Sequence, residues 1–384
     1  MDFLPENYVK DGSVSYHAEI QKSIDLAFEM NLNVLFPPMK YLINECGLTL
    51  RSNMSFNLEG AVFMLADNCS QDGQVFIGKD VENINFLGGE IVGKNGNWNE
   101  GINVRGILIT GNSENISIRN MYLHDLSSNG IGIIGEEDSH IRNIWISDVR
   151  IVNCCNVYGD YESERPGPEP DSDRKDQGSV AFYYVDNFDV RGCIFDQSRS
   201  DGTHFYKCKR GHFSDNKVYR ARMGGYFLES CIEVTASNNI VADNGSRGVT
   251  IERGSMNCTL NGNIVSGSGR QGLWAPNCAG LVVTANIFDK NGRKMNGDSP
   301  DRVWNANITV NSADPTKPRT RDYLITNNII YTSKSQIAAI HVDADKSENI
   351  IIQNNLLKGE NTLILIDGVN KGSVIVKENI TRGF

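Results

Sequence analysis

One short stretch of the sequence, SDGTHFYKCKRGHFSDNK at residues 200–217, concentrates side chains that can transfer protons or carry charge. It contains Asp201, His204, Tyr206 and Lys207. A carboxylate such as Asp201 can belong to the acid–base pair that glycoside hydrolysis requires. Histidine, tyrosine and lysine can remove or return a proton beside a carboxylate. Neighbours along one stretch do not make a site, so the rest of the chain must show what lies beside them.

The second half of the chain repeats a short frame in which asparagine sits between apolar, strand-like residues. The segments ASNNIV, LNGNIV and ITNNII share this frame, which places asparagine at positions 216, 239, 263, 286, 328, 355 and 379. Successive asparagines are 23, 24, 23, 42, 27 and 24 residues apart. Such a period, with short β-branched segments and no helix-length segment between them, predicts a solenoid of stacked β-coils.

Stacked coils place like residues above one another, because parallel strands repeat about every 4.8 Å. We therefore expect the asparagine column to be structural, with each amide bonding the turn backbone and the next amide. Cys208, Cys231 and Cys278 each precede their asparagine by eight residues, and Ser255 takes that position in the intervening coil. Small side chains buried at a turn explain this second column better than a redox site does.

Aligning four coils on a recurrent glycine shows which side chains share a face with the opening stretch. The second and fourth residues after each glycine point outward on an alternating strand. We expect Trp274 to be exposed there, in line to stack on a sugar ring. The aligned glycines are Gly202, Gly225, Gly248 and Gly272. The candidates for catalysis are Asp201, Glu229, Glu252, His204, Lys207 and Arg253. The candidates for substrate binding are Tyr206, Arg222, Arg247, Phe227 and Trp274.

The N-terminal sequence DGSVSYHAEIQKSIDLAFEMNLNVLFPPMKYLI resembles the opening of the pectate-lyase-like right-handed β-helix superfamily. In that pattern Asp-Gly leads into an amphipathic helix and then a V-x-F-P-P strand. The resemblance implies one right-handed parallel β-helix domain of about a dozen coils over residues 1–384, with a capping helix and first strand in residues 1–45. Ile20, Ile24, Ala27 and Phe28 form the helix face suited to cover the open end of a solenoid. Polygalacturonase and pectate lyase signatures are missing, so neither activity carries over.

Two intervals exceed one coil and predict loop insertions at residues 158–178 and 292–322. Loops that leave a solenoid can wall a groove without disturbing the stack, so we expect both to border the cleft. The first contains Asp171, Asp173 and Asp176, whose oxygens suit Ca²⁺, although a charged, proline-rich loop is more often simply solvated. No other cofactor and no metal spacing is evident.

Three kinds of function fit this face. Glu229 and Glu252 lie about one strand spacing apart and Asp201 and Glu252 about two, which suits glycoside hydrolysis. Lys207 with Arg253 or Arg222, helped by His204 or Tyr206, suits a polysaccharide lyase or a uronate epimerase. The third alternative is a non-catalytic, glycan-binding or tailspike-like structural protein with Phe227 and Trp274 as platform. We slightly favour the hydrolase, because three acidic residues fall outward on neighbouring coils.

Composition narrows the partners. The chain has 384 residues and a formal charge of −10, and it shows no dense basic face, which argues against nucleic acid as a partner. No apolar run is long enough to span a membrane. The chain has nine cysteines, an odd number, and none has the C-x-x-C spacing typical of metal sites. We therefore expect no framework of disulfide bonds. A polysaccharide partner implies a secreted, periplasmic or cell-surface protein whose signal segment is not in this chain; by analogy with tailspikes it is a monomer or a homotrimer.

Overall fold

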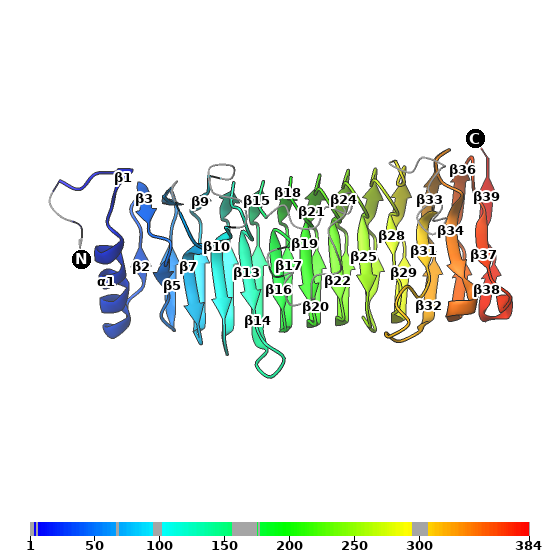
Figure 1. The fold of residues 1–384 in the computed structure, drawn as a ribbon, viewed down its shortest axis with the longest axis horizontal. Helices are drawn as coiled ribbons and strands as arrows, with labels where there is room; N and C mark the ends of the chain where they lie inside the picture. The colour runs from blue at the N-terminus through cyan, green and yellow to red at the C-terminus, as the bar shows by residue number, and fades with distance from the viewer. Residues whose placement is uncertain are drawn as a thin grey trace. The chain divides into compact units, whose positions relative to one another are not determined.

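The fold is a right-handed parallel β-helix, as the repeat and the N-terminal resemblance predict. The computed structural model describes residues 4, 7–66, 69–94, 102–155, 175, 177–293 and 306–383. Two compact units, residues 1–200 and 201–384, each consist of short strands that wind through three parallel sheets. Within each unit a strand pairs with its equivalent one coil further along, and Figure 1 shows these strands as rows of parallel arrows.

The helix α1 (His17–Glu29) covers the first strands of the first unit. Ile20 and Ile24 are buried, as the amphipathic pattern predicts, but Phe28 is left largely exposed beyond the end of that face. The side chain of Gln21 donates to the Thr49 carbonyl at 3.1 Å and accepts from the Thr49 N–H at 2.7 Å. Thr49 belongs to β4 (Leu48–Thr49), the terminal strand of its sheet, so α1 satisfies a strand edge that would otherwise invite pairing with another chain.

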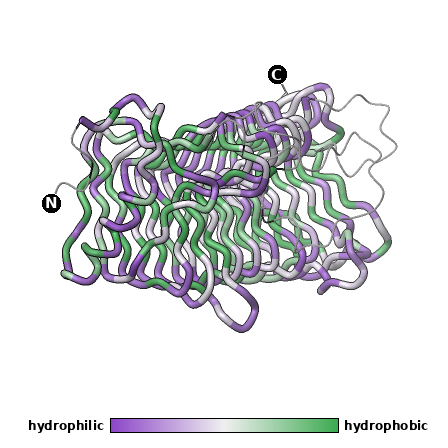
Figure 2. The backbone as a smooth tube through the Cα atoms, turned by 60° about the vertical axis from the view of Figure 1, so that its left-hand side comes forward, coloured by the Kyte–Doolittle hydropathy of each residue, from purple (hydrophilic) through white to green (hydrophobic). Residues whose placement is uncertain are grey.

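A representative coil of the second unit consists of β22 (Tyr226–Glu229), β23 (Ile232–Ser237) and β24 (Ile240–Ala242). Along β23 the buried Val234 and Ala236 alternate with more accessible residues, whereas all four residues of β22 are buried. Figure 2 shows hydrophobic and hydrophilic residues interspersed along the backbone. The sheet that contains β22 carries the candidate residues, and we call it the site sheet. In the second unit it consists of β19 (Thr203–Tyr206), β22, β25 (Val249–Glu252), β28 (Leu273–Trp274), β31 (Ala306–Val310), β34 (Ala338–Asp343) and β37 (Ile364–Asp367).

The asparagine ladder is confirmed. The side-chain oxygen of Asn263 accepts from the backbone N–H of Asn239 at 2.9 Å and from its side-chain amide at 2.8 Å. Asn263 in turn donates to Asn286 at 2.9 Å and to the backbone carbonyl of Ala236 at 3.0 Å. Each amide therefore bonds both the turn backbone and its neighbour, which lets a polar side chain be buried at little cost.

The cysteine column is also buried as expected. Cys208, Cys231 and Cys278 lie in the core. Ser255, which takes the same position in the intervening coil, accepts a hydrogen bond from the Cys231 N–H at 3.0 Å. Burial raises the pKa of the Cys231 and Cys278 thiols well above the usual range. A thiol that stays protonated is a poor nucleophile and a poor metal ligand, so this column serves packing.

Candidate functional site

The register of the site sheet agrees with the glycine alignment. His204 pairs with Phe227, Phe227 with Thr250, and Thr250 with Trp274. Two residues further on, Tyr206 pairs with Glu229 and Glu229 with Glu252. The structure therefore brings these outward side chains together in two adjacent columns, in the order that the sequence predicts.

Their exposure differs from the prediction. Trp274 was expected to be an exposed platform, yet only 8% of it is accessible, and Phe227 is buried as well. The Arg247 guanidinium lies 3.8 Å from the centroid of the Trp274 ring, and the indole N–H donates to Asn311 Oδ1 at 3.0 Å. Phe227 stacks on His204 with a centroid distance of 4.6 Å. Outward side chains thus cover one another's faces, and an alternation pattern does not reveal that packing.

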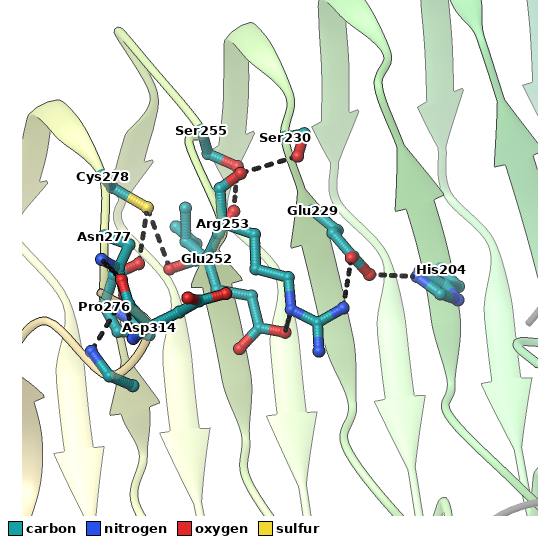
Figure 3. A network of polar contacts seen from close by, with 12 residues as sticks. His204, Glu229, Ser230, Glu252, Arg253, Ser255, Pro276, Asn277, Cys278 and Asp314 are labelled. Atoms are coloured by element: carbon teal, nitrogen blue, oxygen red, sulfur yellow. Dashed lines mark hydrogen bonds and ion pairs between the residues drawn. The ribbon is translucent and has the colours of Figure 1, made fainter. Parts of the chain in front are cut away.

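A charged network connects three coils at the centre of the site sheet (Figure 3). His204 Nε2 lies 3.3 Å from Glu229 Oε2, and Arg253 donates to Glu229 Oε1 at 2.6 Å. Arg253 also lies 3.4 Å from a Glu252 oxygen through its Nε. His204 and Glu229 are essentially inaccessible, whereas 24% of the Arg253 side chain is exposed. Arg253 is therefore the accessible end of a buried acid–base network.

Glu229 is held as an anion inside this network. Burial on its own would raise the pKa of a carboxyl group. The hydrogen bond and charge of His204, together with the charge and hydrogen bond of Arg253, outweigh burial and lower the pKa of Glu229 to about 2. At neutral pH Glu229 can therefore accept hydrogen bonds and orient its partners, but it carries no proton to donate.

The chain turns sharply where each of these strands ends. Lys207, Ser230, Arg253 and Asn277 follow β19, β22, β25 and β28, and all four have left-handed backbone angles, with φ between 51° and 57°. The N–H of Lys207 donates to the Glu229 carbonyl at 2.8 Å, and the N–H of Ser230 donates to the Glu252 carbonyl at 3.1 Å. We call these four residues the corner column. They occupy equivalent positions on successive coils, so Lys207 and Arg253 are two coils apart.

A loop over residues 311–319, within the insertion predicted at 292–322, lies beside this column, but sequence reasoning did not predict its anchor at Asn277. Asn277 anchors it by accepting from the N–H groups of Ala313 and Asp314 at 2.9 and 3.0 Å and by donating to the carbonyl groups of Asp314 and Pro318. The Asp314 side chain accepts hydrogen bonds from Thr316, which lower the pKa of Asp314, and the charges of Lys317 and then Arg253 lower it slightly further. The sequence signal was the asparagine that follows Pro276 at the corner position.

The predicted insertions are only partly within the described residues. Residues 158–174 and 176 lie outside them, as do 294–305, so the walls of a cleft and the Ca²⁺ site at Asp171, Asp173 and Asp176 stay predictions. The described part of 292–322 is not one loop, since it contains β31 and the start of β32 (Thr320–Thr326). Across the described ranges, no group of three or more His, Cys, Asp or Glu side chains is placed to hold a metal ion.

The remaining candidates lie around the network. Asp201 is buried, and its Oδ1 accepts from the backbone N–H of Gly224 at 2.8 Å, which gives it a structural contact. Lys207 and Tyr206 are half-buried, with the Lys207 ammonium 5.4 Å from the Tyr206 ring centroid. Arg222 is half-buried and Arg247 is buried against Trp274. Partly accessible cations and a phenol therefore surround a buried carboxylate.

Comparisons with known proteins identify the architecture. Residues 105–288 match the family model described as a right-handed β-helix region, and no curated protein matches the chain by sequence. The A-module of the mannuronan C-5 epimerase AlgE6 from Azotobacter vinelandii is 15% identical with a TM-score of 0.76, covering 98% of this chain and 97% of that one. PfbA, a surface adhesin of Streptococcus pneumoniae, is 17% identical with a TM-score of 0.64, and the coverage is 98% and 89%.

An exopolygalacturonase from Thermotoga maritima is 11% identical with a TM-score of 0.55, covering 97% of this chain and 89% of that one. The three solved structures are thus similar over nearly the whole chain although their described roles differ. At such identities the likeness concerns the fold alone. The described part of the chain also contains no helix with the length and apolar character needed to cross a membrane. By its strand order and by the match over residues 105–288, the chain has the right-handed parallel β-helix fold.

Proposed function

We propose that the protein acts on an acidic polysaccharide by removing the proton beside a uronate carboxylate, as a lyase or a C-5 epimerase does. The observation that carries this proposal is the buried Glu229 anion, clamped between His204 and Arg253 with its pKa lowered to about 2. A glycoside hydrolase requires one carboxylic acid that protonates the leaving oxygen, and such acids have raised pKa values. Glu229 has the opposite property.

The residues around Glu229 suit proton abstraction better. Removing the C5 proton of a uronate develops negative charge on its carboxylate, and a cation beside that carboxylate stabilises the transition state. Arg253 is accessible and oriented by Glu229 and Glu252. Tyr206, in register beside Glu229 and next to the Lys207 ammonium, is the group we assign as proton acceptor and donor.

Both reactions balance with these groups. The C5–H bond breaks and its electron pair passes into the carboxylate, which Arg253 stabilises. In a lyase the C4–O bond then breaks, a C4–C5 double bond forms, and the departing oxygen takes a proton. In an epimerase Tyr206 keeps the proton it has taken, and water on the opposite face of the sugar donates a proton to C5 and leaves as hydroxide. The similarity to an epimerase module supports this class without separating the two outcomes. We expect a protein that acts on such a polymer to be secreted, periplasmic or attached to the cell surface.

Glycoside hydrolysis is the second candidate. Glu229 and Glu252 are register partners on adjacent strands, which puts their backbones about 4.8 Å apart. Retaining glycosidases hold their two carboxyl groups at about 5 Å. For this candidate Glu252 would have to supply the proton and Glu229 the nucleophile, although both carboxylates already contact the same guanidinium.

The candidates differ in their products on a panel of polyuronates and neutral glycans. A lyase produces unsaturated uronate ends that absorb in the ultraviolet, an epimerase incorporates deuterium at C5 in D₂O without cleavage, and a hydrolase produces reducing ends without the absorbance. We expect one of the first two results, and Tyr206→Phe to lower the rate at least a hundredfold. Reducing ends without ultraviolet absorbance, abolished by Glu252→Gln, would establish hydrolysis instead. Binding without any product would leave the non-catalytic, adhesin-like alternative.

A further inference from the structure

Trp145 is an exposed aromatic side chain that takes no part in the proposed reaction. It belongs to β14 (Ile141–Ser147) in the first unit, in a different sheet from the site sheet, and 45% of it is accessible. Ile144 and Ile146 on either side of it are buried, so the indole points away from the core. Within the described ranges no other ring and no cation stacks on it, whereas the neighbours of Trp274 cover that side chain. Trp145 therefore presents an open aromatic face.

Parallel pairing places a polar side chain beside Trp145 on each neighbouring coil. Its register partners are Ser117 of β11 (Glu114–Arg119) and Asp189 of β17 (Val185–Arg191). One oxygen of the Asp189 carboxylate is covered but has no hydrogen-bond partner in the described part of the chain. Such an oxygen is costly to keep without a donor, so a ligand hydroxyl that reaches Asp189 forms a hydrogen bond that the protein leaves unmade.

A row of amides lies two residues before Trp145 on the same three strands. The side chain of Asn143 donates to Asn115 at 2.9 Å and accepts from Asn187 at 2.6 Å. All three backbones are left-handed, with φ of 58° or 59°. These contacts use one N–H and one lone pair of Asn143 and leave the others open. The amides are thus fixed before a ligand arrives, which lowers the entropy that binding costs.

Two arginines border Trp145 at the opposite end from the amides. Arg119 and Arg191 end β11 and β17, and both are exposed. Neither forms an ion pair with another described residue. Their guanidinium groups can donate hydrogen bonds to hydroxyl or ring oxygens of a ligand. We call the outward side of β11, β14 and β17 the Trp145 face: one open aromatic ring with hydrogen-bonding side chains around it.

An open aromatic ring bordered by hydrogen-bonding groups suits a sugar. The C–H groups on the face of a hexopyranose ring pack against the negative face of an indole, while the hydroxyl groups at its rim need donors and acceptors. The centre of a protein interface is instead depleted of charged residues and enriched in aromatic ones. Asp189 and the two arginines border Trp145, and neither of its register partners is apolar, which favours the sugar.

We propose that the Trp145 face is a glycan-binding surface that stacks one hexopyranose ring of a β-1,4-linked polysaccharide on the indole. In such a chain the ring substituents are mostly equatorial, so the faces of the ring stay apolar and open for stacking. Adjacent strands are about 4.8 Å apart, so the three strands cover about 10 Å along the solenoid, enough for one ring and its hydroxyl groups. The contact requires no carboxylate. The proposal goes beyond the proposed function, because this surface holds a polymer and performs no chemistry on it.

The experiment is calorimetric titration of the full chain with β-1,4-linked hexamers of glucose and of mannose. These oligomers have no carboxylate, so the proposed proton abstraction cannot act on them. We expect at least one to bind with a Kd on the order of 0.1–1 mM. Trp145→Ala should raise that Kd at least tenfold, because it removes the stacked ring at the centre of the contact. Trp145→Tyr keeps an aromatic face and should stay within about threefold of the wild type.

Phe28→Ala is the matched control, because Phe28 is an aromatic residue of nearly equal exposure, 44%, on α1. It should leave the Kd unchanged, and thermal unfolding shows that each variant is folded. The inference is wrong if neither hexamer binds, if Trp145→Ala binds like the wild type, or if Phe28→Ala loses as much affinity. Self-association that Trp145→Ala abolishes, without any sugar binding, would identify a protein interface instead.

A mannuronate hexamer is titrated in parallel to separate stacking from charge. If it alone binds, and Arg119→Ala weakens that binding while Trp145→Ala does not, the surface recognises charge and the stacking inference fails. The inference and the proposed function can fail separately. Neutral hexamers that bind through Trp145 while no polyuronate is converted leave the Trp145 face standing and refute the catalytic proposal. Conversion of polyuronate without any binding of neutral hexamers gives the reverse result.

Discussion

At the scale of single residues, the site depends on a carboxylate whose partners decide its role. Glu229 was predicted from its outward position to be one of a pair of catalytic carboxylates, but the structure buries it and gives both oxygens a cationic or hydrogen-bonding partner. A sequence can show that Glu229 and Glu252 are neighbours. It does not show that Arg253, at the next corner, folds back between them, because that depends on the backbone angle at one turn.

The lowered pKa of Glu229 predicts a pH-dependent contribution to stability. Its folded pKa of about 2 is below the unfolded value of 4.5, so the contribution is complete above pH 4.5 and is lost as pH falls toward 2. At pH 7 we expect Glu229→Gln to lower the free energy of unfolding by about 3 kcal/mol. Denaturant unfolding at pH 7, 5, 4 and 3 measures it.

The matched control for that prediction is Glu233→Gln, which makes the same change at an exposed position on β23 of the same coil. Its effect should stay within about 0.5 kcal/mol. A difference between wild type and Glu229→Gln that is absent at pH 7, or that does not shrink on acidification, would contradict the assignment of a buried anion.

At the scale of elements, sequence reasoning predicted the register well and the burial poorly. Glycine and asparagine recur at fixed places in each coil, so aligning on Gly225 and Gly248 was enough to pair Glu229 with Glu252. The alternation of residues along a strand indicates only which side of the sheet each side chain faces. Trp274 faces outward as predicted, yet Arg247 and Asn311 cover it, and both come from other coils. Such long-range packing has no counterpart in a local pattern.

The asparagine ladder joins successive coils, so replacing one of its residues should destabilise the β-helix. Asn263→Ala removes the acceptor of two donors of Asn239, one of them a backbone N–H, inside the core. We expect a loss of about 3 kcal/mol, because buried donors left without partners cost far more than the bond itself contributes. Asn379→Ala is the comparison, since that residue ends the ladder and is only half-buried. Its cost should be about 1 kcal/mol, and equal losses in a denaturant titration would refute a cooperative ladder.

At the scale of the whole molecule, charge and architecture must both accommodate an acidic polymer. A chain with a net charge of −10 repels a polyanion at long range, so binding has to rely on local cations such as Arg253. A solenoid suits that arrangement, because one turn position recurs on each coil and a row of equivalent side chains follows from the repeat. The same repetition makes stability a sum of contributions from neighbouring coils, so damage is expected to stay local.

Ile24→Ala tests that locality. Ile24 is a fully buried residue of α1, and truncating it leaves a cavity that should cost about 3 kcal/mol between α1 and the coils that it covers. Hydrogen exchange followed by mass spectrometry should show faster exchange in α1 and β4, while peptides from residues 201–384 and the affinity for mannuronate oligomers remain as in the wild type. Leu35→Ala, at a largely exposed position, should change neither. Uniformly faster exchange along the whole chain would mean that the coils unfold as one cooperative block, and the quasi-one-dimensional account would then be wrong.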